Sequence, residues 1–205
     1  MSWGLRLQAA ELGVVVTDKD GKAILDVVVM AMPTEGQTKA NKPQKTVVID
    51  QVDKEFVNHV TVIPIDTPVL FPNNDNIRHH VYSFSASKQF ELPLYKDTPA
   101  KPVTFDKLGV VTLGCNIHDW MVAYIYVTDA PYFSTTNKEG KAQLPNLPAG
   151  EYTFRIWHPR MELTEQATQQ TAVIKNSGET TLSWQLALKP DLRSRRAPLP
   201  IQPGY

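Results

Sequence analysis

The stretch GVVVTDKDGKAILDVVVMAMP, Gly13–Pro33, reads as one β-strand, a turn at Asp20-Gly21 and a second β-strand. Short runs rich in Val, Ile, Thr, Tyr and Phe, the residues that favour strands, recur along the rest of the chain. Turn residues separate these runs, and no long pattern with a period of 3.6 residues is present. The only helix we expect is a short one, at Met161–Gln170 or near Ser87–Glu91. The sequence therefore predicts an all-β protein made of sandwiches or barrels.

The charges of the chain balance, because 21 Lys and Arg residues accompany 21 Asp and Glu residues. Such a chain lacks the basic surface that holds DNA or RNA, so we expect no nucleic-acid partner. No apolar run reaches the roughly 18 residues of a membrane span. The N-terminal MSWGLRLQAA has no apolar core of a signal peptide. We therefore expect either a cytoplasmic protein or one whose signal peptide has been removed.

The domain organisation is indicated by a partial repeat. FSTTNKEGKAQLPNLPAGEYTFRIWHP, Phe133–Pro159, has the same Gly-Lys-Ala after a turn as Gly13–Pro33. Together the two stretches resemble the carboxypeptidase regulatory-like, or transthyretin-like, β-sandwich. About a hundred residues separate them here, which implies a domain inserted into that sandwich; two unrelated β pieces in tandem are the alternative. We expect residues 1–44 and 130–189 to form the transthyretin-like sandwich, 45–129 the inserted domain and 190–205 a flexible tail rich in Pro and Arg.

The most informative chemistry lies in VTLGCNIHDWM, Val111–Met121, which reads Cys115-x-x-His118-x-x-Met121. Gly114 and the β-rich flanks argue against a helix. We therefore expect a loop between two strands that turns a thiolate, an imidazole and a thioether toward one point. Cys115 is the only cysteine, so it forms no internal disulfide. Its neighbours favour a metal ligand over a small buried side chain.

A second imidazole is available from VLFPNNDNIRHHVYSFS, Val69–Ser85, where His79-His80 opens a strand. Two imidazoles, one thiolate and a weak thioether are the donor set of a blue-copper site. Thiolate and imidazole together suit both the soft Cu(I) and the harder Cu(II). Zinc is the rival metal, because one Cys and two His also form catalytic zinc sites. A thioether offers zinc no advantage, so the pattern favours copper.

Only one of His79 and His80 can face the metal, because side chains alternate along a strand. The spacing from the preceding Asn-Asn pair favours His79, with Val81 on the same face. The aromatic residues Tyr82 and Phe84 favour His80, since they would share its core-facing side. We prefer His79, with His80 as the alternative. Met121 also has two interpretations, as a weak ligand or as core packing.

These motifs resemble the cupredoxins. Cys-x-x-His-x-x-Met has the short spacing of the amicyanin ligand loop, and the two segments are similar to cupredoxin-containing proteins labelled methylamine utilisation proteins. The resemblance implies the copper ligands His79, Cys115, His118 and Met121, with one type 1 copper per chain. It also implies a Greek-key cupredoxin β-sandwich of eight strands over residues 45–129, and a periplasmic setting. The chain departs from small cupredoxins at His80, where they usually have Asn.

Three functions are compatible with these features. The first is an electron carrier or relay, with an unidentified redox protein docking near His118, the ligand expected at the surface. The second is copper delivery, buffering or sensing, which His80 and Asp119 would aid as an extra imidazole and carboxylate. The third is an interaction or adhesion module in which copper only stabilises the fold. A type 1 site has no open position for a substrate, and no hydrolase motif is present, so we expect no enzyme.

Overall fold

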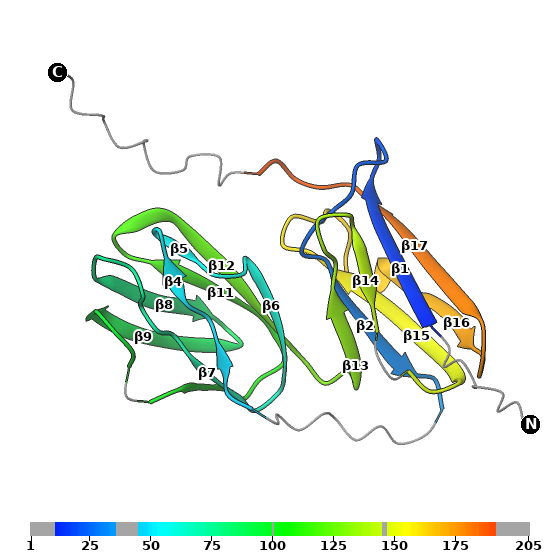
Figure 1. Ribbon diagram of the computed structural model, residues 1–205, viewed down its shortest axis with the longest axis horizontal. Coiled ribbons are helices and arrows are strands. Elements are labelled where there is room, and N and C mark those ends of the chain that lie inside the picture. Colours follow the sequence, from blue (N-terminus) through cyan, green and yellow to red (C-terminus); the bar gives the residue numbers. More distant parts are fainter. Residues whose placement is uncertain (1–10, 36–44, 100, 145–146, 192–205) are drawn as a thin grey trace, which may run out of the picture.

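The structure is a computed structural model, and it describes residues 11–35, 45–99, 101–144 and 147–191. Within these ranges it has 17 β-strands, and the one helix is a 3₁₀ turn at Gln166–Thr168. The strands form two sandwiches that lie side by side (Figure 1). The prediction of an all-β protein is therefore confirmed. None of the described residues form a helix long and apolar enough to cross a membrane.

The first sandwich contains the strands from the middle of the chain. They are β3 (Val47–Val48), β4 (Gln51–Val52), β5 (Glu55–Phe56), β6 (Val60–Pro64), β7 (Thr67–Leu70), β8 (His79–Ser85), β9 (Lys88–Tyr95), β10 (Val103–Phe105), β11 (Gly109–Cys115) and β12 (His118–Thr128). One sheet has the order β6-β12-β11-β8-β9, in which only β6 and β12 pair in parallel. The other sheet has the order β10-β7-β3, and β4 pairs with β5.

The inner faces of these sheets form one core. Ala123 and Ile125 alternate with partly exposed residues along β12, as expected for a strand with one face on the core. Phe105 packs against them from the facing sheet. Cys115 and Met121 belong to the same buried cluster. The residues with metal-binding chemistry therefore lie inside a packed interior.

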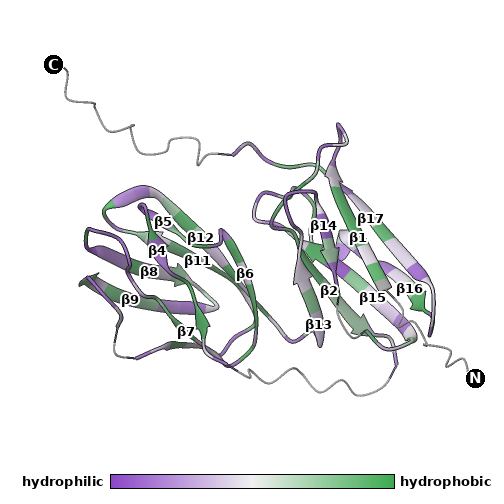
Figure 2. Cartoon of the chain, in the orientation of Figure 1, coloured by the Kyte–Doolittle hydropathy of each residue, from purple (hydrophilic) through white to green (hydrophobic). Residues whose placement is uncertain are grey.

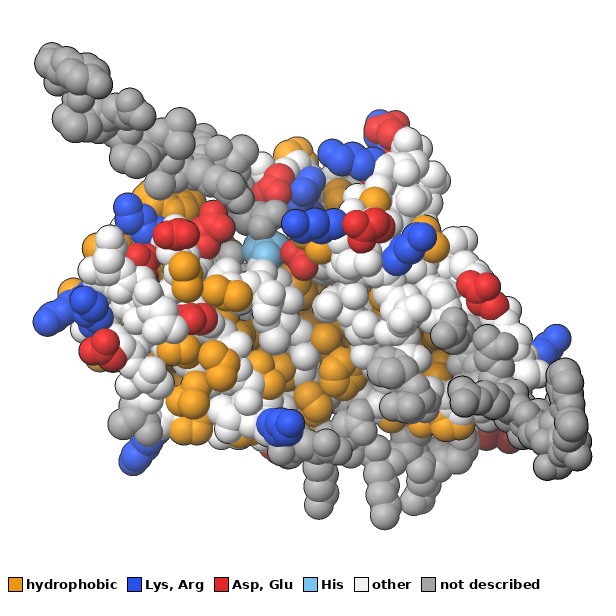
Figure 3. Space-filling view, viewed as in Figure 1, with side chains coloured by type: hydrophobic (Ala, Val, Ile, Leu, Met, Phe, Trp, Pro, Cys, Tyr) orange, Lys and Arg blue, Asp and Glu red, His pale blue; other side chains and the backbone are white. Residues whose placement is uncertain are grey.

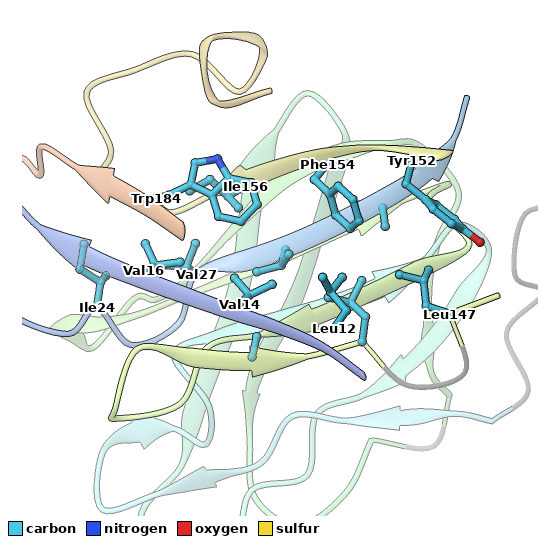
Figure 4. Packing of buried hydrophobic residues seen from close by; sticks show 14 of the residues in the cluster. Leu12, Val14, Val16, Ile24, Val27, Leu147, Tyr152, Phe154, Ile156 and Trp184 are labelled. Atoms are coloured by element: carbon cyan, nitrogen blue, oxygen red, sulfur yellow. The ribbon is translucent and has the colours of Figure 1, made fainter. Parts of the chain in front are cut away.

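The second sandwich is built from both ends of the described chain. Its strands are β1 (Glu11–Asp18), β2 (Val28–Pro33), β13 (Tyr132–Thr135), β14 (Lys141–Gln143), β15 (Gly150–Trp157), β16 (Gln170–Ile174) and β17 (Glu179–Leu186). Its two sheets have the orders β14-β1-β17 and β13-β2-β15-β16. The parallel pairing of β1 with β17 joins the two chain ends. Figure 4 shows Phe154, Ile156 and Trp184 packed between these sheets. Figure 2 shows hydrophobic segments in the strands of both sandwiches.

Strand β2 is buried on both faces, which explains why its sequence lacks a polar-apolar alternation. Val29 faces the core of the second sandwich. Its neighbours Val28 and Met30 belong to a separate cluster with Val60 and Tyr126 of the first sandwich. The outer face of β6 and β12 is thus covered by the second sandwich. This apolar contact joins the two sandwiches.

A polar clamp closes the same interface. The hydroxyl of Tyr126 donates a hydrogen bond of 2.5 Å to Oε2 of Glu165. Arg155 approaches the other oxygen of Glu165 at 3.6 Å. Burial, followed by the hydrogen bond to Glu165, raises the pKa of Tyr126, so its hydroxyl keeps the proton that it donates. A hydrogen bond to a charged group contributes about 1.5–3 kcal/mol to stability. The Tyr126–Glu165 bond therefore stabilises the interface in addition to the apolar contact.

The predicted helix near Ser87–Glu91 is wrong, because β9 occupies these positions and pairs with β8. Met161–Gln170 contains only the 3₁₀ turn. Most of the predicted tail, residues 192–205, lies outside the described residues, as do residues 1–10 and 36–44. The domain limits and the transthyretin-like character of the second sandwich stay predictions.

Gly140 provides a test of how tightly the second sandwich is packed. Its φ is +68°, and a Cβ there would collide with the backbone oxygen of Val16. Gly21 has a similar φ of +78°, yet nothing lies within 4 Å of an added Cβ. We expect Gly140→Ala to lower the free energy of unfolding by about 2–4 kcal/mol, and Gly21→Ala by about 1 kcal/mol. Denaturant titration measures both, and equal losses would contradict the role of the close contact.

Candidate metal centre

Three candidate ligands converge within the first sandwich. His79 opens β8, Cys115 ends β11 and His118 opens β12. Sγ of Cys115 lies 3.7 Å from Nδ1 of His79 and 3.7 Å from Nδ1 of His118. The ligand atoms of all three residues lie within 4.8 Å of one another. One ion can therefore be reached by a thiolate and two imidazoles.

Strand pairing is the reason for this convergence. Cys115 pairs directly with His118 on one side and with Val81 on the other. Directly paired residues place their side chains on the same face of a sheet. His79 lies two residues before Val81 and so shares that face. The sheet thus brings the three side chains together without a long loop.

The connection between Cys115 and His118 is shorter than the sequence predicted. We expected a loop that runs from Cys115 to Met121, but only Asn116 and Ile117 separate β11 from β12. His118 and Met121 both lie on β12. The motif is therefore a tight hairpin, and its ligands are held by strands.

An irregularity in the pairing of β11 with β12 places Met121. Gly114 pairs with Val122, whereas the next residue, Cys115, pairs with His118. Residues 119–121 on β12 consequently have no partner on β11, and we call these three residues the β12 bulge. Such a bulge redirects the side chains within it. Met121 turns into the core beside Cys115 and is only 1% exposed.

Asp75 fixes the orientation of His79. Nε2 of His79 lies 2.9 Å from Oδ2 of Asp75, and His79 is fully buried. Burial alone would raise the pKa of Asp75, but hydrogen bonds from His79 and from the backbone N–H groups of Lys54 and Asn76 lower it overall. Asp75 is therefore an anion, and its Oδ2 accepts a hydrogen bond from the Nε2–H of His79. Nδ1 of His79 is left with its lone pair, on the side of Cys115.

His118 is less exposed than the sequence predicted. Its exposure is 9%, and the ring of Trp120 lies against it with the centroids 5.1 Å apart. Burial, which disfavours the charged form, lowers the pKa of His118. The imidazole is thus neutral near pH 7 and can offer a nitrogen lone pair. The sequence could not show this burial, because the β12 bulge brings Trp120 onto the ring.

His80 does not join the cluster. Its Nε2 lies 3.0 Å from Oε1 of Glu91 on the neighbouring strand, and its ring meets Tyr82 edge-on at 6.1 Å. Of the other histidines, His59 bonds the backbone oxygen of Val122 at 3.1 Å. The structure therefore places His79, and not His80, beside Cys115. Asp75 is the functional candidate that the sequence did not predict, although it precedes His79 by only four residues.

The distances fit a bound metal ion. Metal–sulfur and metal–nitrogen bonds of about 2.3 and 2.05 Å place sulfur and nitrogen about 3.8 Å apart at a trigonal angle, and about 3.6 Å apart at a tetrahedral one. The observed 3.7 Å for both Cys115–His pairs lies between these values. Thiolate, imidazole and thioether are soft or borderline donors, which suit copper. The residues present therefore fit a copper ion.

Comparison with known proteins gives matches among solved structures only. No family model matches the chain, and no curated protein matches it. Among solved structures, a Cu-containing nitrite reductase from Thermus scotoductus is 27% identical with a TM-score of 0.39, over 47% of this chain and 25% of that chain. This chain therefore spans about a quarter of that reductase.

Two smaller copper proteins also match. Amicyanin from Paracoccus versutus is 18% identical with a TM-score of 0.35, over 48% of this chain and 98% of that chain. A purple cupredoxin from Nitrosopumilus maritimus is 22% identical with a TM-score of 0.34, over 40% and 98%. The structural neighbours are thus cupredoxins.

We predict that Asp75→Asn weakens metal binding, because the amide removes the charge that orients His79. Loss of such a partner typically costs about 10–100-fold in metal affinity. Competition with a copper chelator measures the change. Glu91→Gln is the matched control, because it removes the equivalent charge from His80, and we expect no change in affinity. Equal affinity for Asp75→Asn and the unchanged protein would contradict the orienting role.

Proposed function

We propose that this chain is a type 1 copper protein and that it serves as an electron carrier or relay. His79, Cys115, His118 and Met121 would hold one copper ion per chain. The observation that carries the proposal is the buried sulfur of Cys115, equally distant from the two imidazole nitrogens. Copper, when bound, would supply one-electron transfer by cycling between Cu(II) and Cu(I).

The donor residues favour copper over zinc. Cys115 is the only cysteine of the chain, so a site with several thiolates cannot form. Met121 is the remaining soft group in the same buried cluster. A thioether binds copper as a weak axial ligand and gives zinc no advantage. The set therefore matches a type 1 site better than a structural zinc site.

Rigidity supports electron transfer. The four candidate ligands are between 0% and 9% exposed and lie in strands or in the β12 bulge. Packed interiors resist rearrangement, so the ligands keep one geometry in both oxidation states. Small rearrangement favours fast transfer. The same burial keeps substrates away, so we propose that the chain alone performs no enzymatic turnover.

The other two functions have less support. Copper delivery would gain from a second imidazole, but His80 is held by Glu91 at 3.0 Å. Buried ligands also slow the exchange of an ion with an acceptor. An adhesion role would rest on the second sandwich without using the cluster. We therefore propose a redox protein or molecule as the partner, and a periplasmic setting as the resemblance to cupredoxins implies.

The first prediction of this proposal concerns colour. The protein loaded with Cu(II) should show the intense visible band of a thiolate bound to copper in a blue-copper geometry. Cys115→Ser, His79→Ala and His118→Ala should abolish the band, whereas the matched control His80→Ala should keep it. Absorption spectroscopy with a metal assay decides the outcome. A colourless protein that prefers zinc would refute the proposal.

The second prediction concerns the reduction potential. We expect a reversible one-electron couple for the copper-loaded protein, measured by voltammetry. The Asp75 carboxylate balances positive charge on the centre and therefore favours Cu(II). Asp75→Asn should consequently raise the potential, while Glu91→Gln should leave it unchanged. An irreversible couple, or copper that is lost on reduction, would instead favour copper delivery.

A further inference from the structure

A cleft of about 450 Å³ lies where the two sandwiches meet, beside the candidate metal centre. The first sandwich lines it with His59, Trp120 and Tyr124, and the second with Arg160 and Lys189. Figure 3 shows a histidine side chain near acidic and basic side chains at the junction of the two halves. The volume of the cleft lies in the range of small-molecule sites, about 300–1,000 Å³.

Trp120 connects this cleft to the metal centre. It belongs to the β12 bulge, lies against the ring of His118 and also lines the cleft. Trp120 is half-buried, whereas His118 is only 9% exposed. An electron that enters from the cleft thus meets Trp120 before His118.

Both walls of the cleft are held in place. In the second sandwich, Nε of Arg160 donates to the backbone oxygen of Lys189 at 2.7 Å, and its guanidinium pairs with Asp191 at 3.2 Å. In the first, the rings of His59 and Tyr124 pack edge-on at 5.2 Å. A preformed cleft binds a ligand without the cost of ordering its walls.

The lining indicates the chemistry of the ligand. Aromatic rings on one wall favour a planar aromatic molecule. The formal charges in the lining of the cleft cancel, since Asp119 and Asp191 accompany Arg160 and Lys189. A neutral ligand with hydroxyl groups suits such a lining, because a hydroxyl can donate to a carboxylate and accept from a cation.

We propose that this cleft binds small planar diphenols of the hydroquinone class and that Trp120 passes their electron to the copper through His118. One electron leaves the diphenol and reduces Cu(II) to Cu(I). The phenolic O–H bond breaks and its proton goes to water at the mouth of the cleft, where Asp119 is exposed. No other bond forms or breaks. The transfer rests on the proposed copper function, but binding does not.

The binding test uses the metal-free protein and 1,4-hydroquinone without oxygen, followed by calorimetry. We expect saturable binding of one molecule per chain. Trp120→Leu should weaken it about ten-fold, as expected for a lost aromatic contact. Arg160→Ala should also weaken it, and this variant leaves the candidate ligands untouched. Phe84→Ala is the matched control, because Phe84 is an exposed aromatic residue (80%) outside the cleft, and it should bind normally.

The transfer test follows the loss of the visible band in the copper-loaded protein as hydroquinone is added. The rate should saturate with concentration in the unchanged protein and in Phe84→Ala. In Trp120→Leu the rate should be about ten-fold lower than in the unchanged protein. It should also increase linearly with hydroquinone concentration, without saturating. Absence of saturable binding, or binding that Trp120→Leu and Arg160→Ala leave unchanged, overturns the proposal. Normal binding to a protein that forms no blue site would refute the copper function and the electron transfer, and leave the binding cleft standing.

Discussion

The pairing of Cys115 with His118 is the constraint on which the rest of the site depends. From Gly109 to Gly114 the two strands pair in regular register, and then the register jumps so that Cys115 faces His118. This jump has two effects. It places the sulfur and one imidazole on the same face of the sheet. It also leaves three residues of β12 without partners, and these residues form the bulge beside the cluster.

The β12 bulge serves two sides of the protein at once. Met121 points into the core with Cys115, while Asp119 and Trp120 line the cleft against the second sandwich. A regular hairpin would alternate these side chains and could not bury His118, Met121 and Ala123 together. The bulge is therefore the element that gives the centre its fourth candidate ligand. It also places the half-buried Trp120 between His118 and the cleft.

The sequence predicted the parts of the structure that depend on local pattern. Strand composition predicted an all-β chain, and alternation along β8 buries His79 and Val81 while His80 between them is only partly buried. The helix near Ser87 failed because Lys, Gln, Glu and Leu favour helices, whereas pairing with β8 makes Phe90 and Leu92 face inward. The burial of His118 and the bond from His79 to Asp75 arise from tertiary contacts and register, which no local pattern contains.

These contacts explain what the second sandwich contributes to the candidate metal centre. It covers the outer face of β6 and β12 through Val28, Met30 and Tyr126, and the Tyr126–Glu165 hydrogen bond closes that interface. The same strand β12 carries His118 and the bulge at its other end. Fixing β12 from outside therefore restrains the candidate ligands as well as the near wall of the cleft. A small domain with the cluster alone would lack the wall formed by Arg160 and Lys189. The two sandwiches thus act on the site together, since one supplies the donors and the other encloses the approach to them.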